Sequence, residues 1–179
     1  MSTDAHPIMT AERSDFLETL GKHRYFLRFT VRDLTDEQAA ERSTASELCL
    51  GGLIRHVAEV ESGWVDFIER GPEAMAHGDV DWSDEAVAEA WRTRFQMPAG
   101  VSLASLLERY EKVATRTDTL IAALPDLDAS HPLPEAPWFE KGARWSARRV
   151  LLHIIAETAQ HAGHADIIRE TLDGSKTMG

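Results

Sequence analysis

The sequence predicts an all-α fold, a bundle of four long helices with long loops after the second and the third. Apolar residues recur every three or four positions through four long segments, cap signals mark most of their ends, and no strand-like alternation separates them. The chain has 179 residues and 43% hydrophobic content, which is enough to bury one core. We therefore expect a single domain over residues 1–179.

The first long helix is expected to run from about Ala11 to Arg32, with Thr10 as its N-cap. A short helical piece should follow Thr35, because Thr35 and Gln38 have the spacing of a capping box. The first quarter of the chain thus predicts one long helix and one short helix.

The second long helix is expected to begin at Thr44–Glu47, which has the same capping-box spacing, and to end at Gly71 before a proline. The third should start around Ser102 and end near Leu124, also before a proline. Both helices carry a continuous apolar stripe, so both should pack against the core.

The fourth long helix follows Ser146 and should end at Gly174, which can adopt the left-handed conformation of a C-terminal cap. Residues 71–101, with a short helix expected after Ser83, form one long crossover. Such a crossover predicts up-down-down-up order, in which the second and fourth long helices are antiparallel neighbours.

Composition excludes several classes of function. The net charge of −11 disfavours binding to nucleic-acid phosphates or to anionic membranes, since both require a basic surface. A single cysteine, Cys49, cannot form an internal disulfide, and the sequence has neither a signal peptide pattern nor a long apolar run. We expect a cytoplasmic protein with no nucleic-acid partner and no membrane partner.

Four ionisable side chains follow one face of the last predicted helix: His153, Glu157, His161 and His164. Aliphatic residues continue the same stripe, so the row should face the core. Burying a carboxylate or an imidazole costs several kcal/mol unless the group is paired or bound to a metal. The whole row cannot serve one ion, because its ends are about 16 Å apart at the rise of a helix.

His56 lies on the apolar stripe of the second long helix, at a level where it can meet Glu157 and His161. Two imidazoles and one carboxylate are the donors of catalytic zinc sites and of non-haem iron sites that keep an open position. His153 with Glu157, or His161 with His164, are alternative ligand pairs. Another alternative is a hydrogen-bonded network of His56, Glu157 and His161 without a metal.

The long connections over 71–101 and 125–145 are rich in tryptophan. Loops of this length in compact domains are commonly lids or binding loops. Trp82, Trp138 and Trp145 are therefore candidate residues of a substrate pocket. The alternative is that these rings only cover one end of the bundle.

Two segments carry a resemblance to a known superfamily. The first runs from Ser146 to Glu170 and contains Glu157-Thr-Ala-Gln-His161-Ala-Gly-His164; the second is Leu53-Ile-Arg-His56-Val-Ala-Glu59-Val-Glu-Ser-Gly-Trp64. Both resemble the DinB/YfiT-like superfamily of metalloenzymes, and more closely its mini-circle-type members. The likeness covers nearly the whole chain and implies a DinB-like four-helix bundle.

In that superfamily the metal is held by one histidine on the second helix and by a His-x-x-x-His pair on the last. His56 and His161 match two of these positions, and Glu157 stands at the third. The same His-Glu-His variation occurs in mycothiol-dependent maleylpyruvate isomerase, a relative that binds zinc. The resemblance implies one divalent ion on His56, Glu157 and His161, with zinc first and nickel or iron as alternatives.

The resemblance also implies a homodimer and a low-molecular-weight thiol, such as mycothiol, that attacks a small electrophile. His153, His164 and Glu59 would orient the ligands or accept a proton. The function expected is therefore a metal-dependent thiol S-transferase. The alternatives are a non-catalytic metal-binding protein of the stress response and a hydrolase that activates water on the metal.

Overall fold

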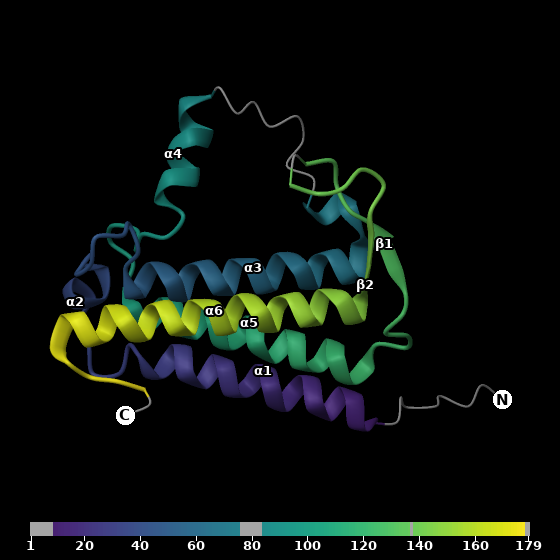
Figure 1. The fold of residues 1–179 in the computed structure, drawn as a ribbon, viewed down its shortest axis with the longest axis horizontal. Coiled ribbons are helices and arrows are strands. Elements are labelled where there is room, and N and C mark those ends of the chain that lie inside the picture. Colours follow the sequence, from purple (N-terminus) through teal and green to yellow (C-terminus); the bar gives the residue numbers. More distant parts are fainter. Residues whose placement is uncertain (1–8, 76–83, 137, 178–179) are drawn as a thin grey trace.

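A computed structural model describes residues 9–75, 84–136 and 138–177, and it contains the predicted bundle. The four long helices are α1 (Ala11–Phe29), α3 (Leu50–Arg70), α5 (Leu103–Ala123) and α6 (Ala147–Asp173). In Figure 1, α1 and α6 run in one direction while α3 and α5 run in the other. The all-α fold class and the up-down-down-up order are confirmed.

Helix α3 packs against both α5 and α6, and α6 also packs against α1. Leu53, Tyr110 and Ala165 lie in one cluster of buried residues, and Phe67 and Ile154 lie in a second. Because α3 and α6 are antiparallel neighbours, residues from the middle of each helix can meet. None of the helices in the described ranges is long and apolar enough to cross a membrane.

Shorter elements complete the structure: α2 (Asp36–Ala40), the 3₁₀ turn η1 (Pro72–Met75), α4 (Glu85–Thr93), β1 (Ser130–Pro132) and β2 (Arg144–Ser146). The two strands pair antiparallel directly before α6, with Ser130 opposite Ser146. These three-residue strands are too short to give an alternating pattern in the sequence, and they leave the all-α class unchanged. Figure 1 shows α4 and the loop between the strands on the same side of the bundle, above α3.

Most predicted caps are present. The side chains of Thr10, Ser102 and Ser146 cap α1, α5 and α6, and Thr35 forms a capping box with Gln38. Gly174 ends α6 in the left-handed conformation, with φ of 79°. These signals are local, which is why the sequence predicts them well.

Two predicted boundaries are wrong. Helix α3 begins at Leu50 rather than at Thr44, because the Thr44 hydroxyl accepts from the backbone N–H of Ser46 and forms a bend instead of a cap. Cys49 is the N-cap, and its Sγ accepts from the backbone N–H of Gly52. Helix α1 ends at Phe29, and the hydroxyl of Thr30 donates to the carbonyl of Leu27.

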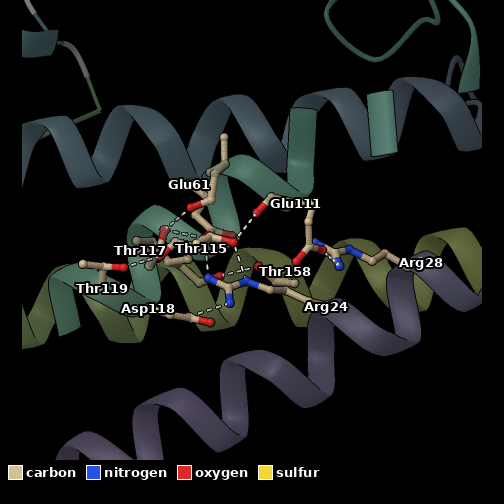
Figure 2. A network of polar contacts seen from close by, with 11 residues as sticks. Arg24, Arg28, Glu61, Glu111, Thr115, Thr117, Asp118, Thr119 and Thr158 are labelled. Atoms are coloured by element: carbon tan, nitrogen blue, oxygen red, sulfur yellow. Dashed lines mark hydrogen bonds and ion pairs between the residues drawn. The ribbon is translucent and has the colours of Figure 1, made fainter. Parts of the chain in front are cut away.

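A buried ion pair, which the sequence does not predict, joins three of the long helices. Arg24 of α1 contacts the carboxylate of Glu61 on α3, whose side chain is fully buried. The hydroxyl of Thr117 on α5 donates to Glu61 over 2.6 Å, and Arg24 also donates to Asp118 over 2.8 Å. Figure 2 shows this network between α1, α3 and α5.

Candidate metal centre

The three predicted ligands lie together where α3 meets α6. One ligand atom from each of His56, Glu157 and His161 lies within 4.8 Å of the other two. Nε2 of His161 is 3.6 Å from Oε2 of Glu157, and the rings of His56 and His161 meet edge to face with centroids 4.9 Å apart. Glu157 and His161 are neighbours on one helical face because they are four residues apart.

The donor set fits a divalent ion. In a tetrahedral site, two ligand atoms that are each about 2.1 Å from zinc lie about 3.4 Å apart. The Glu157–His161 separation of 3.6 Å is close to that value. The widest separation in the set is at most 4.8 Å. It has to shorten by about 1.4 Å, a movement that two side chains can share. Two imidazole nitrogens and one carboxylate oxygen leave a fourth position for an exogenous ligand.

The electrostatics of the cluster favour the protonation states that metal ligands require. Burial, reinforced by the neighbouring His161, lowers the pKa of His56 to about 4. Interaction with His161 lowers the pKa of the Glu157 carboxyl. At neutral pH His56 is therefore neutral and Glu157 ionised, so neither ligand has to lose a proton before it can bind a cation.

His153 and His164 lie on either side of the trio on α6. Nε2 of His153 is 3.9 Å from Oε1 of Glu157, and Nδ1 of His164 is 3.4 Å from Nδ1 of His161. Burial lowers the pKa of His153, so this ring is also neutral at pH 7. Each outer histidine thus contacts one candidate ligand.

The expectation that this row faces the centre of the core is wrong. Only His161 is buried, at 7% exposure, whereas His153, Glu157 and His164 are half-buried. Thr158 and Ile154 occupy the core-facing positions instead. The row lies at the margin of the buried face, where a small molecule could reach an ion bound to these residues.

Glu59 has other partners. Its Oε1 accepts from Nε of Arg55 over 2.9 Å and from Nη1 of Arg109 over 3.4 Å. Arg109 of α5 is exposed, whereas Arg55 and Glu59 of α3 are half-buried. Its carboxylate is therefore already paired with two cations and does not contact the candidate ligands among the described residues.

Aromatic side chains form a wall beside His153. Trp64 of α3 stacks on Trp145 of β2, with centroids 4.8 Å apart and 17° between the planes. Both rings meet the ring of His153 in edge-to-face arrangements, with centroids 5.0 and 5.1 Å apart. Trp138 lies farther out, is 59% exposed and stacks with Trp91 at 6.2 Å. The remaining pocket candidate, Trp82, lies outside the described residues.

Sequence reasoning missed Phe95. This residue follows α4, and its ring lies 4.4 Å from the ring of His56 and 5.8 Å from that of His161. The segment that carries it packs directly on α3: a Cβ atom at Gly52 would lie 1.7 Å from the carbonyl oxygen of Phe95, and one at Gly51 would lie 2.5 Å from the sulfur of Met97. The glycine pair in an apolar helix was the available signal, because such pairs permit close approach of another backbone.

Replacing Gly52 with alanine is expected to destabilise the protein by about 1–3 kcal/mol, since the new methyl group overlaps backbone that has to move. Gly63 of the same helix is a matched control, because nothing lies within 4 Å of its Cβ position. Gly63→Ala should stabilise by about 0.5–1 kcal/mol through helix propensity. Urea unfolding measures both changes, and equal stabilisation by the two variants would contradict the close approach of residues 95–97.

Comparisons with known proteins agree with this architecture. Among solved structures, a conserved protein from Enterococcus faecalis has the same fold, with a TM-score of 0.66 over 94% of this chain and 100% of that chain, at 14% sequence identity. No curated protein sequence matches the chain. The family model of mycothiol S-transferases matches residues 15–174. The chain therefore belongs to the mycothiol S-transferase family, part of the DinB/YfiT-like superfamily.

Proposed function

We propose that this protein is a divalent-metal-dependent S-transferase that joins mycothiol to a small electrophile, with His56, Glu157 and His161 as the metal ligands. Membership of the family implies a thiol-dependent transferase of the mycothiol S-transferase type. The observation that carries the metal requirement is the convergence of two imidazoles and one carboxylate within 4.8 Å. Zinc is the expected ion, because this donor set leaves an open position in catalytic zinc sites.

A divalent cation bound there would lower the pKa of a coordinated thiol, so that the nucleophilic thiolate is present at neutral pH. The negative charge of Glu157 moderates that effect by offsetting part of the cation's charge. His164 orients the ring of His161 through their Nδ1 contact of 3.4 Å. His153 is neutral and adjacent to Glu157, which places it to take up the proton that the thiol releases.

The aromatic residues around the cluster suit an apolar electrophile. Trp145 and Trp64 border His153, and Phe95 covers His56. Trp145 is thus the best supported of the three pocket candidates, while Trp138 and Trp82 stay predictions. The single domain over 1–179, the homodimer, the cytoplasmic location and the proton-accepting role of Glu59 also stay predictions.

The transferase proposal is tested by following mycothiol consumption and thioether formation with benzyl chloride and monobromobimane as electrophiles. We expect turnover by the zinc-loaded protein, its loss on chelation and its recovery when zinc is restored. Turnover that survives chelation would contradict the metal requirement. Hydrolysis of test esters without thiol consumption would instead favour the metal-dependent hydrolase, and metal binding without any turnover would favour a non-catalytic protein.

A further inference from the structure

One arginine beside the candidate centre has no carboxylate partner within the described part of the chain. Arg94 follows α4, and its neighbour Arg92 forms ion pairs with both Glu85 and Glu89. Within the described ranges, Nη1 of Arg94 donates to the backbone carbonyl of Trp91 and to no carboxylate. Acidic residues are not scarce, since the chain has 30 of them against 19 lysines and arginines. Within the described residues, Arg94 therefore lacks a carboxylate partner because of where it lies and not because acidic residues are few.

The surroundings of Arg94 partly remove its charge from water. Its guanidinium lies 3.9 Å from the ring centroid of Trp91 and 4.4 Å from that of Phe95. The residue is half-buried, and burial lowers its pKa. A partly desolvated cation is stabilised by aromatic faces, but a charge-assisted hydrogen bond to an anion would stabilise it further.

Phe95 links this arginine to the candidate centre. Its ring contacts the Arg94 guanidinium and also the His56 imidazole, at 4.4 Å in both cases. The backbone at Phe95 is fixed, because its carbonyl oxygen packs against Gly52 and accepts from Sγ of Cys49 over 3.6 Å. The positive charge of Arg94 is therefore held one ring away from the cluster, and its effect reaches His56.

We propose that Arg94 binds the carboxylate of an aromatic electrophile, whose flat apolar body lies on Phe95 beside the metal-bound thiol. A guanidinium presents several parallel N–H donors in a plane, which matches a carboxylate better than a neutral amide. The proposal rests on the proposed transferase function for its thiol and names the substrate class of that site. One electrophile of this class is para-(chloromethyl)benzoate. When mycothiol attacks its chloromethyl carbon, the S–C bond forms, the C–Cl bond breaks, and chloride and the thiol proton are released.

Equilibrium binding tests this subsite without any turnover. We would measure para-toluate and para-toluamide by calorimetry on zinc-loaded protein and on chelated protein, both without thiol. These two probes have nearly the same shape and differ in charge. Arg94→Gln should weaken toluate binding about tenfold and leave toluamide unchanged, because it removes a charge-assisted hydrogen bond.

Two further arginines serve as controls. Arg92→Gln changes an exposed arginine two residues away and should leave both probes unaffected. Arg149 lies over Trp145 at 4.2 Å, and its charge acts on His153, which contacts the candidate ligand Glu157. If Arg149→Gln weakened toluate as much as Arg94→Gln, the general field of the site would be responsible and the proposal would be wrong. Toluate binding that persists in Arg94→Gln but disappears on chelation would assign the carboxylate to the metal and also overturn the proposal.

Kinetics separate failure of this inference from failure of the proposed function. With mycothiol and the zinc-loaded protein, Arg94→Gln should lower kcat/KM about tenfold for para-(chloromethyl)benzoate and not for its carboxamide. If the wild-type protein turned over neither electrophile, the transferase proposal would be contradicted, but the toluate binding result would still test the carboxylate subsite. Equal kcat/KM losses for the two electrophiles would show that Arg94 supports the fold and does not recognise the carboxylate.

Discussion

Replacing His161 with alanine is expected to abolish stoichiometric metal binding and to lower kcat/KM for mycothiol transfer by more than about a hundredfold. Loss of a residue that merely orients a metal ligand already lowers metal affinity or activity by about ten- to a hundredfold, and loss of a ligand should cost more. His161 is the most buried of the three candidate ligands, and it contacts both Glu157 and His56. Without it, two donors on two different helices remain. The ratio of metal to protein, determined by mass spectrometry on protein purified without a histidine tag, is the direct measurement.

Two other histidines calibrate this result. Among the described residues, the ring of His23 on α1 contacts the ring of Phe26, with centroids 6.4 Å apart, and lies outside the cluster of candidate ligands. His23→Ala should therefore retain the full metal content. His164→Ala should retain the metal with reduced affinity, because Nδ1 of His164 contacts Nδ1 of His161. An unchanged metal-to-protein ratio in His161→Ala would refute the ligand assignment, as would an equal loss in His23→Ala.

The features that the sequence predicts are those encoded by neighbouring residues. The caps at Thr10, Ser102 and Ser146 depend on side chains that bond within three residues of themselves. The spacing of Glu157 and His161 fixes their common face in the same way. His56 requires one more step, the antiparallel contact of α3 with α6, and the helix order supplies it. The three candidate ligands could therefore be proposed from the sequence, because only one long-range contact had to be inferred.

The features that the sequence does not predict depend on long-range contacts or on competition between local signals. Phe95 reaches His56 only because the chain after α4 folds back onto Gly52, and a pattern along the sequence does not specify that return. Thr44 has the spacing of an N-cap but bonds Ser46 instead, while Cys49 caps α3. The polar row on α6 lies at the margin of the buried face and not at its centre. Helical periodicity does not predict this difference, because it gives the direction of a side chain around the helix axis only to within part of a turn.

Glu61 also depends on long-range contacts that the sequence does not predict. Its replacement with glutamine is expected to lower the free energy of unfolding by about 3 kcal/mol, near the lower end of the cost of breaking a buried ion pair. Glutamine keeps the shape but leaves Arg24, which is 37 residues away in sequence, without its buried counter-charge. Burial opposes the charge of Arg24, and Glu61 and Asp118 outweigh that cost and raise its pKa. Asp118 remains in the variant, but it is 48% exposed and screened by water.

The neighbouring pair between Arg28 and Glu111 provides the matched control, because Figure 2 shows it beside the buried network and the Glu111 side chain is 62% exposed. Glu111→Gln should cost less than about 1 kcal/mol, as exposed ion pairs do. Urea unfolding of both variants measures the difference. Equal costs would mean that water reaches Glu61 and that the pair is not desolvated.

A double replacement separates the cost of leaving one buried charge without its partner from the net contribution of the ion pair to stability. Arg24→Met combined with Glu61→Leu removes both charges and fills the space with apolar groups, so its free energy of unfolding should return to within about 1 kcal/mol of the wild type or exceed it. The recovery has a physical basis, because the cost of Glu61→Gln comes from the stranded cation and not from a lost net attraction. If the double variant were as unstable as Glu61→Gln, the bonds from Thr117 and Arg24 to Glu61 would stabilise α1, α3 and α5 directly, beyond the compensation of buried charge.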